Sequence, residues 1–225
     1  MKKNILLFIV TLLTASFFAA CGGSEGGSAS SGSAKKLAKN EILGDMPNAV
    51  YQHYLVMEAI DADKKANKID VNSEKDLEKQ KKLNEKYKAL KKEEEGKFKA
   101  TVEKIKAELV GKEVPFELEK GIGYEVTSCK ITNVEGKTVH VAFEVKVTDL
   151  QTAHMTATRI PDLIVSSCEL DKTGAQIGSN NGYHIELSER AVGATGKATS
   201  SIIMNLGNAE QYVDFAKILF KKNKP

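Results

Sequence analysis

The sequence predicts an α+β fold, in which an N-terminal helical hairpin is followed by an antiparallel β-sandwich and a C-terminal helix. Three observations predict this order. Up to about residue 110, apolar residues recur at spacings of three and four, which is the helical period. From about residue 113 they alternate with polar residues, as in a half-buried strand. After residue 207 the helical spacing returns.

The first residues have the three parts of a secretory signal. Lys2 and Lys3 supply positive charge, residues 5–18 are mostly apolar, and small residues follow them. The apolar stretch is shorter than the roughly 20 residues that a membrane-spanning helix needs. We therefore expect residues 1–20 to be a signal peptide.

The run Phe18-Ala19-Ala20-Cys21 resembles the lipobox of bacterial lipoproteins, although Phe18 stands where leucine is commonest. The resemblance implies that Cys21 becomes the first mature residue and carries a diacylglycerol and an acylated amine, with palmitate as a typical chain. Gly22 is not the aspartate that retains many lipoproteins in the inner membrane, which favours the outer membrane, on its periplasmic or its surface face. An ordinary signal peptide, with Cys21 as a chance thiol, is the alternative.

Residues 21–44 are rich in glycine and serine, and we expect them to form a flexible tether that follows the lipid. Pro47 is typical of a first helical turn. Residues 74–110 contain many lysines and glutamates and a sparse apolar stripe. Because a stripe this narrow needs one partner, we expect an antiparallel, coiled-coil-like helical hairpin over residues 45–111.

Residues 112–207 contain the alternating segments. In the clearest one, Val139 to Val147, valine and phenylalanine alternate with mostly polar residues after a turn at Gly136. About seven short strands with turn signals between them predict a β-sandwich. Residues 208–225 have apolar side chains at helical spacing, which predicts the C-terminal helix.

The sandwich segment also resembles a known family. The turn Asp171-Lys172-Thr173-Gly174, with Ile177 after it and a glycine-containing segment before a late strand, is similar to immunoglobulin-like domains of bacterial envelope lipoproteins. These motifs belong to hairpin turns and specify no activity. The resemblance implies an immunoglobulin-like sandwich and, by fold analogy alone, a binding role.

Composition argues against two classes of function. The net charge is +3, and the basic residues are nearly all lysine, with arginine at Arg159 and Arg190. Nucleic-acid binding is not expected, since arginine suits phosphate and base recognition better than lysine does. The absence of tryptophan counts against a carbohydrate platform. We expect no cofactor.

Once Cys21 is lipidated, Cys129 and Cys168 remain. In the oxidising envelope a disulfide between them is a candidate, and two separate buried thiols are the alternative. A disulfide would link two predicted strands of the sandwich and restrict the unfolded chain.

The histidines offer only weak candidates for a metal site. None has a spacing typical of metal ligands, so we expect no bound metal. His140 and His184 lie on the polar faces of predicted strands. If those strands were neighbours, the two histidines could form a site with Glu144 or Glu186.

The sequence therefore predicts a membrane-anchored lipoprotein of the cell envelope that is a non-catalytic binding or structural-interaction module. Membrane lipid is one expected partner, and an envelope protein is a candidate for a second. An enzyme or enzyme accessory that acts on envelope polymers is one alternative, and it would need converging histidines and carboxylates. A small-ligand carrier is another, and it would need a large apolar pocket.

Overall fold

A computed structural model describes residues 35–156 and 161–222 of the chain. Contacts divide the chain into two compact units. In the described chain, the first unit consists of Lys35 and residues 52–95, and the second consists of residues 36–51 and residues 96 onward. The expected signal peptide and Cys21 lie outside the described residues.

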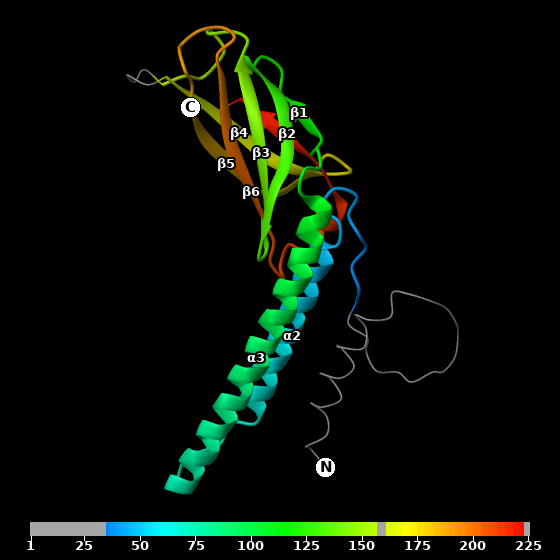
Figure 1. The fold of residues 1–225 in the computed structure, drawn as a ribbon, viewed down its shortest axis with the longest axis vertical. Helices are drawn as coiled ribbons and strands as arrows, with labels where there is room; N and C mark the ends of the chain where they lie inside the picture. The colour runs from blue at the N-terminus through cyan, green and yellow to red at the C-terminus, as the bar shows by residue number, and fades with distance from the viewer. Residues whose placement is uncertain (1–34, 157–160, 223–225) are drawn as a thin grey trace, which may run out of the picture. The chain divides into compact units, whose positions relative to one another are not determined.

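Two helices precede the strands (Figure 1). Helix α2 spans Met46–Ala66 and helix α3 spans Glu74–Leu109. A capping box starts α3: the Ser73 Oγ accepts a hydrogen bond from the Asp76 backbone N–H at 3.2 Å and donates one to the Asp76 carboxylate at 2.6 Å. Helix α3 continues without interruption through Gly96. One glycine destabilises a helix by about 1 kcal/mol, which does not interrupt a helix of 36 residues.

In the first unit, polar contacts join the two helical segments in opposite directions along the chain. Lys91 pairs with Asp61 at 2.6 Å, and the His53 Nδ1 lies 3.2 Å from the Glu94 carboxylate. Tyr87 is buried, and its hydroxyl donates to Asp63. The few apolar side chains of this unit are thus supplemented by ion pairs and hydrogen bonds.

The second unit contains two β-sheets (Figure 1). The four-stranded sheet has the order β1-β7-β4-β5, and its strands are Phe116–Leu118 (β1), Phe215–Lys221 (β7), Asp162–Asp171 (β4) and Gln176–Glu186 (β5). The three-stranded sheet has the order β2-β3-β6, and its strands are Tyr124–Glu135 (β2), Thr138–Val147 (β3) and Thr195–Ile203 (β6).

Side chains from both sheets form the core of the second unit. The ring of Phe143 on β3 lies 5.0 Å from that of Phe220 on β7 and 5.1 Å from that of Tyr183 on β5, centroid to centroid. The sheets therefore face each other across a layer of aromatic and aliphatic side chains. The alternating residues of β3 from Val139 to Val147 are buried in this layer.

The predicted C-terminal helix is wrong. Residues 211–214 form a short 3-10 helix, and Phe215–Lys221 is strand β7, which lies between β1 and β4. Short apolar segments fit both periods, so spacing alone does not distinguish them. Here β1 and β4 bond both edges of the segment, and this tertiary context outweighs its helical spacing.

The prediction of an N-terminal helical hairpin is also wrong. The two helices do not form a separate hairpin that precedes the sheets. The first residues of α2 and the last residues of α3 belong to the second unit. There Met46, Val50, Val102, Ile105 and Leu109 are buried. The apolar stripe predicts that the helix packs against something, but a stripe does not identify its partner.

The strand order also contradicts the expected immunoglobulin-like, wholly antiparallel sandwich. An immunoglobulin constant domain has strand orders 1-2-5-4 and 3-6-7. Here the orders are 1-7-4-5 and 2-3-6, and β1 pairs with β7 in parallel. The turn motif from Asp171 to Gly174 joins β4 to β5, and such hairpins occur in many sandwich topologies.

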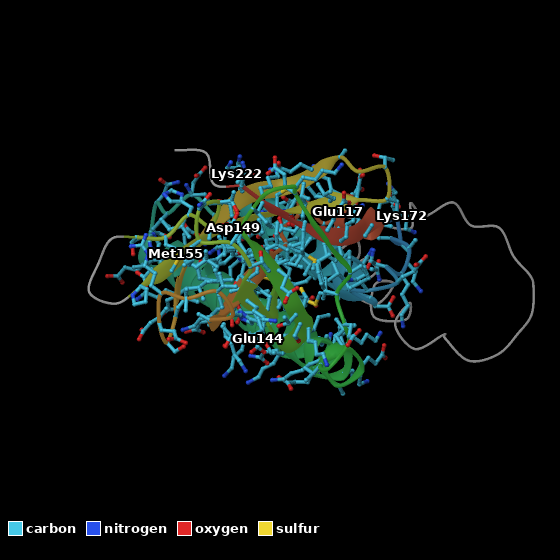
Figure 2. The ribbon with its side chains drawn as sticks, turned by 90° about the horizontal axis from the view of Figure 1, so that it is seen from above. Glu117, Glu144, Asp149, Met155, Lys172 and Lys222 are labelled. Carbon is cyan, nitrogen blue, oxygen red and sulfur yellow. The ribbon has the colours of Figure 1, made fainter. Side chains whose placement is uncertain are left out.

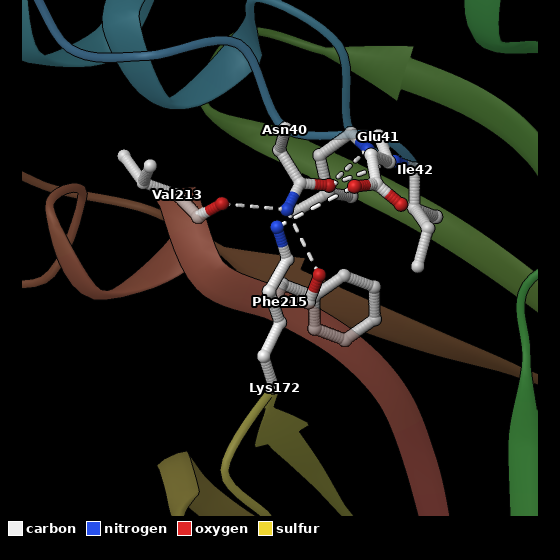
Figure 3. A network of polar contacts seen from close by, with 7 residues as sticks. Asn40, Glu41, Ile42, Lys172, Val213 and Phe215 are labelled. Carbon is white, nitrogen blue, oxygen red and sulfur yellow. Dashed lines mark hydrogen bonds and ion pairs between the residues drawn. The ribbon is translucent and has the colours of Figure 1, made fainter.

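The segment at residues 36–44, which composition placed in the tether, has three buried side chains, Leu37, Asn40 and Leu43. Figure 3 shows Asn40 beside the end of the 3-10 helix and the start of β7. Its side-chain amide donates to the carbonyls of Val213 and Phe215, both at 2.8 Å. These hydrogen bonds connect residues 36–44, at the start of the second unit, to residues near its C-terminal end.

Candidate functional site

Cys129 and Cys168, the candidates for a disulfide, are both free, buried thiols. Cys129 lies on β2 and Cys168 on β4, so they come from different sheets. Burial raises the pKa of the Cys129 thiol to about 12. This thiol is therefore protonated at neutral pH and is a poor nucleophile.

The structure does not bring His140 and His184 together. His140 lies on β3 and His184 on β5, which belong to different sheets. His140 lies between the buried Val139 and Val141, and the exposed His184 precedes the buried Ile185, so each histidine lies on the outer face of its own sheet. The His140 Nδ1 is 3.3 Å from the Ser201 hydroxyl, and the His184 Nδ1 is 3.8 Å from the Asp162 carboxylate.

The two carboxylates proposed beside these histidines have other surroundings. Glu144, labelled in Figure 2, forms an ion pair with Lys197 at 3.5 Å across the β3–β6 pair. Glu186 is exposed at the end of β5. Within residues 35–156 and 161–222, no cluster of histidine, cysteine, aspartate or glutamate could hold a metal ion. In the same residues, neither helix is apolar enough over a sufficient length to cross a membrane.

The outer edge of β6 is the clearest candidate for a binding surface. Strand β6 is the last strand of its sheet, and it pairs with β3 from Thr138↔Ile203 to Lys146↔Thr195 without a register shift. The strand is regular, and Lys197 is its single charged residue. An edge of this kind presents unpaired backbone groups to a further strand.

Backbone bonds at the two ends of the ladder show which groups face outward. The Val147 N–H donates to the Ala194 carbonyl at 2.9 Å, and the Met204 N–H donates to the Lys137 carbonyl at 3.0 Å. Because hydrogen-bonded pairs alternate in an antiparallel ladder, the even-numbered residues of β6 bond to β3. The backbone groups of its odd-numbered residues therefore face away from β3.

Three odd-numbered residues, Lys197, Thr199 and Ser201, form what we name the free edge. In the part of the chain that the structure describes, their outward N–H and C=O groups have no hydrogen-bond partner. On one side, Gly196 approaches β5 so closely that a Cβ there would lie 2.4 Å from Ile185. On the other side, the Asn208 amide already donates to the Ile203 carbonyl at 3.2 Å.

The edge of β2 is covered and the edge of β5 is irregular. The outer edge of β2 bonds to the segment after α3, with the Val114 N–H donating to the Cys129 carbonyl and the Ile131 N–H donating to the Lys112 carbonyl. Strand β5 is interrupted opposite Ser167–Glu169 by a register shift, where Gly178 has a φ of +71°. Such bulges protect an edge from further pairing, and β6 lacks one.

A second cluster surrounds Glu169, a buried carboxyl on β4. Asn181 on β5 donates to it at 3.2 Å, and the buried Tyr212 lies near it. A Cβ on Gly178 would lie 3.3 Å from the Glu169 carboxylate and 2.9 Å from the Tyr212 hydroxyl. Burial raises the pKa of Glu169 to about 7.

Sequence reasoning missed the Glu169 cluster, although one signal was present. Alternate residues of β4 lie on one face of the strand, and this face carries Leu163, Val165, Ser167 and Glu169. An acidic residue thus lies on the same face as apolar residues. The motif from Asp171 to Gly174 predicts a hairpin turn and indicates no role for the Glu169 carboxyl that precedes it. The partners Asn181 and Tyr212 come from other elements and could not be identified locally.

Next to this cluster, a chain of hydroxyl groups crosses the core between the sheets. The Tyr183 hydroxyl on β5 donates to the Ser200 Oγ on β6 at 2.7 Å and lies 3.5 Å from the Ser167 Oγ on β4. The chain links β4 and β5 to β6, so it fixes one sheet against the other. A buried hydrogen-bonded network of this kind favours one arrangement of the core over others.

Comparisons with known proteins found no match: no family model, no curated protein and no solved structure resembles this chain closely enough to indicate its family.

Proposed function

We propose that this protein is a lipid-anchored protein of the bacterial cell envelope, and that its second unit binds an extended polypeptide segment on the free edge of β6. The free edge is the observation that carries the binding role. Backbone pairing at an open edge gives affinity without a deep pocket, and side chains on alternate positions give selectivity.

The anchor is proposed from the lipobox-like run that ends at Cys21. Residues 22–34 separate it from the described chain and are rich in glycine and serine. A segment of this composition behaves as a flexible linker. It would let the second unit reach partners near the membrane, with the outer membrane as the proposed location.

The anchor is tested by metabolic labelling with an alkyne analogue of palmitate, in bacteria that express the full chain. We expect labelling of the wild type and of Cys129→Ser, and complete loss of label in Cys21→Ser. Cys129→Ser is the matched control because it removes a buried thiol and leaves the N-terminus unchanged. Label that persists in Cys21→Ser would reject the anchor.

The binding role is tested by placing a photo-reactive amino acid at Thr199 and irradiating intact envelopes. We expect a crosslink from position 199, and none from position 132. Thr132 is the control because it is an exposed threonine on β2, and the outer edge of β2 is covered near it. Equal crosslinking from both positions would show that the free edge is not the binding surface.

A further inference from the structure

We propose that the strand bound at the free edge is β6 of a second copy of this chain. The two strands would run antiparallel about a two-fold axis at Thr199, and the two three-stranded sheets would join into one. This inference rests on the proposed function, because it names the occupant of the same edge. Cyclic two-fold dimers are the commonest soluble oligomers, and they require a self-complementary surface.

The free edge is symmetric in its backbone groups. Lys197, Thr199 and Ser201 have outward N–H and C=O groups, with Thr199 in the middle. An axis at Thr199 places Thr199 opposite Thr199 of the second copy, and Lys197 opposite Ser201. All of these are pairs of the hydrogen-bonded type, so each would exchange two backbone bonds.

The side chains of β6 also permit this register. Lys197 is the one charged residue of the strand, and the register places it opposite a serine instead of another lysine. Like charges directly opposite each other would destabilise the pair. Lys197 also has a partner in its own copy, since its ammonium lies 3.5 Å from Glu144.

Exposed apolar side chains flank the free edge. Among the described residues, Val192 and Ile203 are the most exposed large hydrophobic side chains, at 62% and 50%. Ile203 is the last residue of β6, and Val192 lies shortly before the first residue of β6. The antiparallel register places Ile203 opposite Thr195 of the second copy, beside the turn that carries Val192 of that copy. Pairing would therefore cover apolar surface at both ends of the contact.

The proposed anchor favours the same partner. Two copies anchored to one membrane would meet at a high effective concentration, which strengthens a contact of modest size. The register shift in β5 would not allow the corresponding self-pairing, because an interrupted edge cannot keep a continuous ladder.

The first test compares Thr199→Pro with Thr199→Val in the full lipidated chain, by sedimentation in detergent. The Thr199 N–H faces away from β3, so proline removes no bond within the copy but removes bonds between copies. We expect a dimer for the wild type and for Thr199→Val. We expect at least about a tenfold weaker dimer for Thr199→Pro, since bonds on the two-fold axis are lost in both copies.

The melting temperature of Thr199→Pro measures whether the variant is folded, and hydrogen exchange gives a second readout that needs no variant. The amides of Thr199 and Ser201 should exchange slowly at high protein concentration and quickly at low concentration. A wild type that is monomeric throughout, with concentration-independent exchange, would overturn the inference. So would a dimer that persists in folded Thr199→Pro.

The register is tested by crosslinking in intact cells with a short bismaleimide. Thr199→Cys should crosslink to itself, and a mixture of Lys197→Cys and Ser201→Cys should crosslink more strongly than either variant alone. The native Cys129 and Cys168 are buried and should not react. A crosslink from position 199 to a different protein would overturn the second-copy inference and leave the proposed function in place. The lipid-labelling experiment with Cys21→Ser tests the anchor alone and does not test the pairing of two copies.

Discussion

Asn40 and Glu169 are both buried polar side chains of the second unit, and they affect its stability in opposite ways. The neutral amide of Asn40 makes a full set of bonds: it donates to two carbonyls and accepts from the Ile42 and Leu43 N–H groups at 2.8 and 2.7 Å. Glu169 is ionisable and accepts from Asn181, and no cation among the described residues pairs with it.

The difference shows when a buried polar group stabilises a fold. A neutral group with all its hydrogen bonds costs little to bury, and removing it leaves several partners unsatisfied. A buried acid without a cation instead favours its protonated form, so its contribution depends on pH. Asn40 is therefore a structural fastener at every pH, whereas Glu169 destabilises the fold when it ionises.

The largest expected effect comes from Asn40→Ala. The change leaves buried backbone groups near Ile42, Val213 and Phe215 without partners, so we expect a loss of about 4 kcal/mol in the free energy of unfolding. Denaturant melts followed by circular dichroism would measure it. Asn67→Ala is the control, because Asn67 is an exposed amide that bonds to Asp63, and it should cost below about 1 kcal/mol. Similar losses in both variants would contradict the assigned role of Asn40.

Glu169→Gln tests the pH dependence. The pKa of Glu169 rises from 4.5 to about 7 in the folded state, so its stabilising contribution is complete below pH 4.5 and is lost as the pH rises through 7. Glutamine is neutral at every pH. We expect the variant to gain about 3 kcal/mol relative to the wild type between pH 4.5 and pH 8. Unfolding free energies at both pH values measure this gain.

Other groups titrate alike in the two proteins, so the difference between variant and wild type isolates Glu169. A difference that does not change between pH 4.5 and pH 8 would show that the Glu169 pKa is ordinary. The unfolding free energy of Asn181→Ala should depend on pH more strongly than that of the wild type. The Asn181 amide bonds to the charged form of Glu169 and lowers its pKa, and the variant lacks this bond.

The smallest expected effect compares Gly178→Ala with Gly174→Ala. Both glycines have positive φ, +71° and +86°, so each alanine introduces backbone strain of about 1 kcal/mol. A Cβ at Gly174 meets open space, whereas at Gly178 it meets Tyr212 and Glu169. We expect Gly178→Ala to cost about 1 kcal/mol more, as an overpacking effect. Equal melting temperatures would show that the cluster around Glu169 is loosely packed.

Features set by neighbouring residues could be predicted from the sequence. The change from helix to strand near residue 112, the alternation of β3 and the turns at Gly136 and Gly174 all appear in the structure. Side-chain period and glycine conformation depend on a few adjacent residues, so a short segment contains the information. The lipid anchor at Cys21 stays a prediction, because it lies outside the described residues.

The candidate sites could be predicted only in part. The sequence shows Ser167 and Glu169 on the apolar face of β4, but it does not show that Asn181 and Tyr212 lie beside Glu169. The free edge could not be found from composition, because an edge is a position in a sheet and not a property of a strand. His140 and His184 both lie on polar faces of alternating strands, which does not show whether the strands are neighbours, and the sheet order separates them.

The sequence by itself thus determined the type of most elements and the ends of the hairpins. The tertiary structure decided that residues 215–221 are a strand beside β1 and β4, that both helices divide between two units, and that β6 has an open edge. The physical reason is range. Local patterns record which side of a segment is apolar, whereas its neighbours follow from burial and backbone bonds formed with segments far away in the chain.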